Sequence, residues 1–155
     1  MSRIALICIV LLFHPQGLYS QSGRFMRTFS GTNTEETLDI ELDQLGNTYT
    51  CGHFSGFGNF GDISLTATNL SDGFVCKLDP AGTPIWAIKL GGSGFDRVVA
   101  LAIKPSGNII ATGVFDGSAS IGSFQLSSLG NTQDIFVAEI QPDGSVLWAN
   151  SIAGD

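Results

Sequence analysis

Short apolar segments, some alternating with polar residues and some continuous, recur along the chain from about residue 24. Residues 37–42 alternate, so that Leu38, Ile40 and Leu42 share one side of an extended chain. Residues 98–103 are apolar throughout, which is typical of a strand buried on both faces. Because these segments are short, rich in β-branched residues and bounded by turn residues, the pattern predicts an all-β chain.

The segments also repeat along the sequence. Residues 72–82 align with residues 134–144 at an offset of 62, and Trp86 aligns with Trp148 at the same offset. Further upstream, Gly46-Asn47 recurs as Gly107-Asn108 at an offset of 61. Self-similarity at one period predicts a repeat architecture, here with two complete units of about 61 residues.

Each unit is predicted to hold four strands, the first two and the last two joined by tight turns in which proline or aspartate comes early and glycine late. The predicted strands are 37–42, 48–54, 73–78 and 84–90 in the first unit, and 98–104, 108–115, 134–140 and 145–152 in the second, and residues 24–30 match the fourth strand alone.

The fold predicted from these strands is a partial β-propeller. It consists of two four-stranded antiparallel blades, 37–90 and 98–152, and one extra N-terminal strand, 24–30. Sheets that are apolar on both faces must stack, and propellers stack four-stranded sheets around an axis and close with four to eight blades. A β-sandwich or a β-solenoid is the alternative, although a sandwich gives no reason for the internal match. With two blades, the chain is expected to be the N-terminal part of a larger propeller, and assembly from several copies is the alternative.

The first twenty residues have the pattern of a secretory signal peptide. Arg3 precedes ten apolar residues, 4–13, and a small residue, Ser20, follows the helix-breaking Pro15. The apolar run is too short to anchor the chain in a bilayer. We therefore assign 1–20 to a signal peptide and 21–155 to the partial propeller, and expect a secreted, cell-surface or periplasmic protein with no membrane span after signal removal.

Composition narrows the range of functions. Hydrophobic residues make up 43% of the chain and charged residues only 14%, which excludes a disordered acidic tail. Seven Lys and Arg against fourteen Asp and Glu give a net charge of −7, so that nucleic acid would be repelled.

Aspartates fall on or beside the long connections, which in a four-stranded meander gather at one end of the blades. The candidate ligand-binding residues are Asp62, Asp96, Asp116 and Asp134. Acting as turn and cap groups is the simpler role for them, and calcium is the cofactor that oxygen-rich loops of an exported protein would suit. The acidic side of the first strand, Asp39, Glu41 and Asp43, is expected either to be a solvated face or to line a channel.

The sequence gives little evidence for a catalytic site, and we expect that the protein is not an enzyme. His53 is the single histidine after the signal segment, and no Gly-x-Ser-x-Gly motif is present. Cys51 and Cys76 lie on neighbouring predicted strands, which leaves open a disulfide between them, two buried thiols, or a zinc site that includes His53 but lacks a fourth ligand. Trp86 and Trp148 are predicted to pack between blades, and a sugar-stacking platform is the alternative.

The pattern of the second unit resembles the bacterial β-propeller repeat family called SBBP. The resemblance rests on residues 107–113 and on Phe115, Ile121-Gly122, residues 134–140, Asp143-Gly144 and Leu147-Trp148-Ala149. It implies an exported protein with many blades and no agreed catalytic residues. The expected function is thus a non-catalytic extracellular scaffold or binding module, whose partners are further blades of the parent chain or of other copies, and also a glycan or a cell-surface protein. A fragment of a carbohydrate-active propeller enzyme and a calcium-stabilised adhesin are the alternatives.

Overall fold

The fold is all-β. The computed structural model describes residues 29–130 and 132–152, and every regular element within them is a β-strand. The predicted signal peptide and most of the predicted leading strand lie outside the described residues. No helix that is long and apolar enough to cross a membrane occurs in the described part of the chain.

The eight strands predicted for the two units are confirmed, with ends that differ by at most two residues. Each set of four forms an antiparallel meander in chain order. The first-unit sheet is built from β2 (Glu35–Leu42), β3 (Thr48–Phe54), β6 (Asp72–Leu78) and β7 (Pro84–Gly92), and the second-unit sheet from β8 (Arg97–Ile103), β9 (Ile109–Asp116), β12 (Gln133–Ile140) and β13 (Val146–Ile152).

The long inserts form two further hairpins, and each hairpin pairs with a strand that precedes its own unit. They are β4 (Phe57–Phe60) with β5 (Ile63–Thr66), and β10 (Ser118–Ile121) with β11 (Phe124–Ser127). Strand β10 of the second unit pairs with β7 of the first, so that the first-unit sheet has six strands in the order β11-β10-β7-β6-β3-β2. In the same way β4 pairs with the two-residue strand β1 (Ser30–Gly31), which gives a three-stranded sheet β1-β4-β5. The units therefore interlock instead of forming separate four-stranded blades.

Glycine permits this interlocking. A Cβ on Gly92 would collide with the backbone of Ser118, and a Cβ on Gly31 would collide with the carbonyl oxygen of Phe57. These glycines are 61 positions apart and each lies where an outer strand receives the next hairpin. The repeat thus preserves the residue that lets two backbones meet closely.

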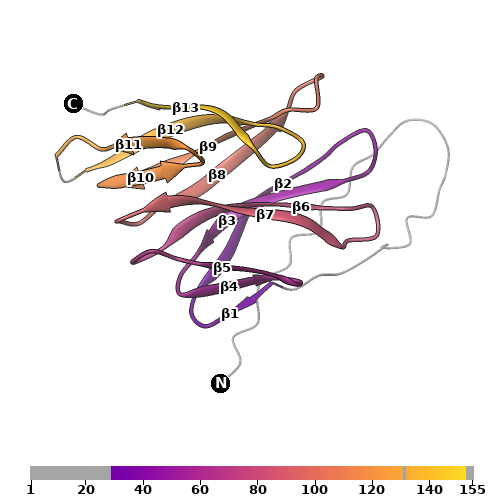
Figure 1. The fold of residues 1–155 in the computed structure, drawn as a ribbon, viewed down its shortest axis with the longest axis horizontal. Helices are drawn as coiled ribbons and strands as arrows, with labels where there is room; N and C mark the ends of the chain where they lie inside the picture. Colours follow the sequence, from indigo (N-terminus) through magenta and orange to yellow (C-terminus); the bar gives the residue numbers. More distant parts are fainter. Residues whose placement is uncertain (1–28, 131, 153–155) are drawn as a thin grey trace.

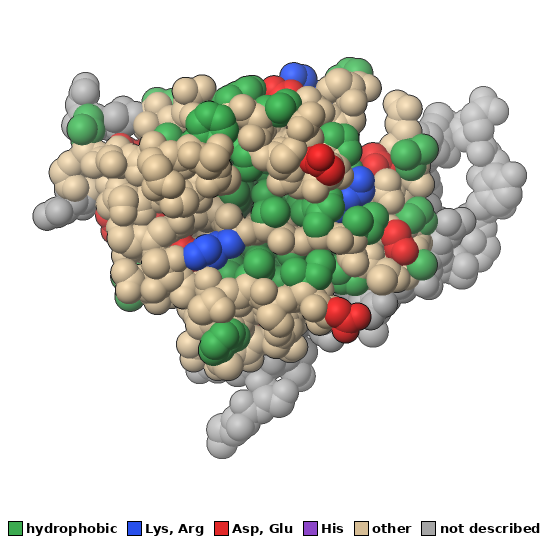
Figure 2. Space-filling view, in the orientation of Figure 1, with side chains coloured by type: hydrophobic (Ala, Val, Ile, Leu, Met, Phe, Trp, Pro, Cys, Tyr) green, Lys and Arg blue, Asp and Glu red, His purple; other side chains and the backbone are tan. Residues whose placement is uncertain are grey.

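The sheets lie in layers, with the second-unit sheet above the first-unit sheet and the three-stranded sheet below it in the view of Figure 1. The core between the two larger sheets contains, among others, Tyr49, Val75, Phe115, Phe136 and Ile140. A second core contains Phe54, Phe60 and Phe74, against which Phe29 packs. Hydrophobic side chains reach the surface across the middle of the face in Figure 2, where charged side chains are few and scattered.

The two ends of the sheets differ as the sequence predicts. Tight turns close the end that joins β2 to β3, β6 to β7, β8 to β9 and β12 to β13, and each contains a glycine with positive φ. The inserted hairpins and the connection from β7 to β8 lie at the other end. None of the three sheets closes on itself.

Candidate functional site

A junction between the two units forms at the loop end of the sheets. Ser71, just before β6, makes a parallel bridge with Phe95, just before β8. The Asp96 N–H donates to the Ser71 carbonyl oxygen at 3.0 Å, and the Ser71 N–H donates to Gly94 O at 3.4 Å. This short parallel pairing ties the first-unit sheet to the first strand of the second unit.

Two buried carboxyl groups meet at this junction. Asp72 is 0% exposed and Asp96 is 1% exposed. Asp72 Oδ2 accepts a hydrogen bond from the Thr68 N–H at 2.7 Å and lies 3.0 Å from Lys89 Nζ. Burial, with the Asp72 carboxylate beside it, raises the pKa of Asp96 to about 6, although hydrogen bonds from the amides of Asp116 and Gly92 oppose the shift.

A cavity of about 80 Å³ opens beside the acid pair. It is lined by His53, Ser71, Phe95, Asp96, Arg97 and Gln133, which come from both units. His53 Nδ1 is buried and has no hydrogen-bond partner, and His53 Nε2 lies 3.9 Å from Glu36 Oε2. Burial lowers the pKa of His53, so its imidazole is neutral at pH 7. The cavity has room for a few water molecules or one small polar group.

The predicted ligand-binding aspartates do not converge. Asp62 is exposed in the turn of the β4–β5 hairpin, whereas Asp134 is buried at the start of β12, where its Oδ2 accepts the Leu129 N–H at 3.0 Å. Asp116 meets Asp96 through its backbone N–H, at 3.0 Å from Asp96 Oδ1. Among residues 29–130 and 132–152, no group of three or more His, Cys, Asp or Glu side chains is placed to hold a metal ion. The contacts of Asp96 and Asp134 are those of capping groups.

The possible Cys51–Cys76 disulfide is corrected by the structure. Both cysteines are free and buried. In the register of β3 and β6, Thr50 is opposite Cys76 and Cys51 is opposite Val75, so the two side chains point to opposite faces of the sheet. Cys51 packs in the core between the two larger sheets and Cys76 in the second core. This geometry also separates Cys76 from His53 and removes the three-ligand zinc arrangement.

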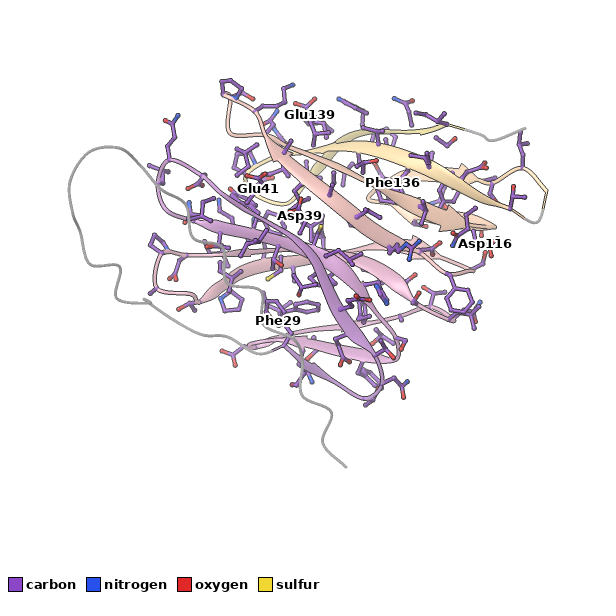
Figure 3. All side chains as sticks on the ribbon, turned by 180° about the vertical axis from the view of Figure 1, so that it is seen from behind. Phe29, Asp39, Glu41, Asp116, Phe136 and Glu139 are labelled. Atoms are coloured by element: carbon purple, nitrogen blue, oxygen red, sulfur yellow. The ribbon has the colours of Figure 1, made fainter. Side chains whose placement is uncertain are left out.

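Asp39 in β2 and Asp43 just after it are half-buried and bind backbone N–H groups. Asp39 lies between β2 and β8 in Figure 3, and its Oδ2 accepts the Leu101 N–H at 2.7 Å. Asp43 instead caps its own turn by accepting the N–H groups of Leu45 and Asn47. Asp39 therefore links two neighbouring first strands, one from each unit.

The two tryptophans at matching positions have different partners. Trp86 Nε1 and Lys77 Nζ both donate to the Pro142 carbonyl oxygen, at 3.0 and 3.1 Å, so the β12–β13 turn rests on the first unit. Trp148 Nε1 donates at 2.9 Å to Glu139 Oε2 within its own sheet. Trp86 thus packs between units, as the sequence predicts.

The acid pair was missed by the sequence analysis, whose candidate ligand-binding residues include Asp96 but neither Asp72 nor Lys89. A signal was present, because Asp72 aligns with Asp134 at one offset and Glu35 with Asp96 at the other. The alignment shows recurring acids, but it does not show that two of them from different units meet. Neither a protein-family model nor a curated protein sequence matches this chain.

Proposed function

We propose that this chain is a non-catalytic extracellular scaffold or binding module of the β-propeller type, and that its two units are consecutive blades. One observation carries the proposal: the outer face of the second-unit sheet is uncovered at positions whose equivalents in the first unit are buried by the next sheet. The resemblance to SBBP repeats and the predicted signal peptide support an exported setting.

Equivalent residues on the two outer faces make the comparison direct. Leu90 is 0% exposed, whereas Ile152, 62 positions later, is 59% exposed. Val75 is fully buried, whereas its counterpart Val137 is only partly buried. Val99, Thr112, Val114 and Ile135 line an apolar surface groove of about 180 Å³ on the same face. We infer that the occupant of this face is a further repeat unit, because a repeat unit covers the equivalent face of the first-unit sheet.

The carboxylates give no support to the alternative of a glycoside-cleaving enzyme. The two carboxyl groups that do lie together, those of Asp72 and Asp96, are buried, so a glycan cannot reach them. Glycosidic cleavage needs an acid and a second carboxylate on either side of an accessible bond. A scaffold or binding module remains the function that the geometry supports best.

The two outer faces are not identical, and the experiment must allow for this. Ile135 stands where the first unit has Gly73, at which a Cβ would lie only 2.9 Å from the backbone nitrogen of Val98. Glu139 stands where the first unit has Lys77, the donor to the β12–β13 turn. The chain extended by one unit therefore carries glycine and lysine at these two positions, so that the added unit meets the same surface that the second unit meets on the first.

The test is a chain extended by one unit. Residues 94–152 are repeated after Asp155, which keeps the offset of 62, and Ile135→Gly with Glu139→Lys is introduced in the preceding unit. We expect Tm to rise and binding of the dye ANS to fall relative to the unextended chain, because the apolar face becomes covered. The control carries Phe136→Asp in the added copy, which prevents its packing. The proposal would be contradicted if the extended chain without Phe136→Asp has the same Tm as the unextended chain and binds more ANS.

A further inference from the structure

We propose that Asp72 and Asp96 share one proton in the folded protein, and that this proton fastens the first-unit sheet to the second unit as a pH-sensitive clamp. The inference concerns the junction between the two units. It is independent of whether further units cover the outer face.

The geometry first requires a donor between the two carboxyl groups. A Cβ built on Gly91 would lie 2.5 Å from Asp72 Oδ1 and 2.7 Å from Asp96 Oδ2, so these two oxygens border the same small space. Asp72 Oδ1 is buried and no hydrogen-bond donor reaches it. A buried carboxylate oxygen without a donor is costly, and a proton on Asp96 supplies one.

The remaining contacts assign the proton to Asp96. Asp72 Oδ2 forms an ion pair with the ammonium group of Lys89, at 3.0 Å from its Nζ. Asp96 has no ion-pair partner of its own, and burial raises its pKa to about 6. An Asp96 Oδ2–H group can donate to Asp72 Oδ1 while Oδ2 still accepts the Gly92 N–H.

The charges of the cluster balance only with this proton in place. Lys89, ionised Asp72 and neutral Asp96 sum to zero, whereas loss of the proton leaves one uncompensated negative charge in a buried position. The other charged or titratable groups around Asp96 are Asp116, whose N–H it accepts, the neighbouring Arg97, and His53 across the cavity. Arg97 is exposed and His53 is neutral at pH 7, so neither replaces the proton.

One part of this arrangement, a buried acid beside a glycine, recurs at the start of the first unit. Glu35 is 61 positions before Asp96, and its Oε1 is buried without a hydrogen-bond partner beside Gly31. Burial also raises the pKa of Glu35. An acid at the start of the first strand, set against a close glycine, is thus a recurring feature of the unit.

The direction of the pH effect follows from proton linkage. The pKa of Asp96 is higher in the folded state, about 6, than its usual 3.8, so the stabilisation is complete below pH 3.8 and is lost as pH rises through 6. His53 acts in the opposite sense, because its lowered pKa reduces stability as pH falls. The clamp is therefore measured in a His53→Gln background.

The experiment compares urea unfolding of that background chain between pH 4.5 and 7.5. We expect the unfolding equilibrium constant to increase about ten- to thirty-fold over this range. Asp96→Asn, whose amide donates to Asp72 at every pH, should remove most of this increase. Asp72→Asn should do the same, because its amide donates to an ionised Asp96. Asp62→Asn, which removes one exposed charge, is the matched control and should retain the full pH dependence.

A direct titration makes the proposal testable even where these variants fail to fold. In the unsubstituted chain with ¹³C-labelled aspartate, the NMR signal of the Asp96 carboxyl should titrate near pH 6. The proposal is overturned if that carboxyl titrates below about pH 4.5, or if the pH dependence of unfolding persists in both Asp72→Asn and Asp96→Asn.

Discussion

At the scale of single residues, several acidic side chains of this protein accept hydrogen bonds from its backbone. Asp79 and Asp143 accept turn N–H groups, as Asp43 does, while Asp39 and Asp96 accept N–H groups from the other unit. Exposed turn aspartates are common and contribute little individually, but a carboxylate that binds across two units helps to set how the units pack. The sequence could not distinguish these two roles, because both produce an aspartate next to a strand end.

Asp39→Ala tests such a cross-unit contact. The substitution removes the acceptor of the Leu101 N–H and leaves that amide unpaired on the first strand of the second unit. Hydrogen bonds to a charged group contribute about 1.5–3 kcal/mol, so we expect the free energy of unfolding in urea to fall by about that amount. Amide hydrogen exchange at Leu101 should accelerate.

Glu41→Ala is the control for Asp39→Ala, because Glu41 lies two positions along the same strand. It should change the free energy of unfolding by less than about 0.5 kcal/mol. If the two substitutions lower the free energy of unfolding equally, the Asp39–Leu101 hydrogen bond contributes no more to stability than the Glu41 side chain does.

At the scale of elements, the eight unit strands could be predicted from the sequence because their signals are local. Residues 48–54 form a strand with the predicted ends, and residues 145–152 differ from β13 by one residue. The pairing of β10 with β7 could not be predicted in this way. It joins Ile121 to Leu90 across two intervening strands, β8 and β9, and nothing in the pattern of either segment specifies the partner. The acid pair was missed for the same reason, since Asp72 and Asp96 meet only after the units have packed.

Gly92→Ala tests the pairing of β10 with β7. An added Cβ would meet the backbone of Ser118 and Ala119, so β10 must move away from β7. Overpacking of this kind costs about 1–3 kcal/mol, and we expect that loss in the free energy of unfolding. Hydrogen exchange should increase selectively in β10 and β11.

Ser127→Ala, on the exposed side of β11, is the matched control for Gly92→Ala and should leave exchange unchanged. Uniform acceleration of exchange across all strands in Gly92→Ala would mean that the hairpin is not a separable element.

At the scale of the whole molecule, the two units are similar in fold but differ in what covers them. The second unit buries the outer face of the first-unit sheet, and its turn at Pro142 rests on Trp86 and Lys77. On the equivalent face of the second unit, Glu139 instead binds Lys104, Asn108 and Trp148. In Figure 3, Glu139 lies at the opposite end of the sheets from Asp116, so this polar cluster is far from the acid pair. The outer faces of the two sheets therefore present different side chains to whatever packs against them.

Equivalent leucine and isoleucine positions provide the test at this scale. Leu90→Ala removes a side chain that is 0% exposed between the two larger sheets, and we expect it to lower the free energy of unfolding by about 2–5 kcal/mol. Ile152→Ala removes the equivalent side chain from the uncovered face, where it is 59% exposed, and should cost less than about 1 kcal/mol.

In the chain extended by one unit, Ile152→Ala should become as costly as Leu90→Ala, because the added hairpin then covers it. Urea unfolding of these three variants and of their two parent chains measures both differences, and an Ile152→Ala cost that stays small in the extended chain would show that the added unit does not dock as the second unit docks on the first.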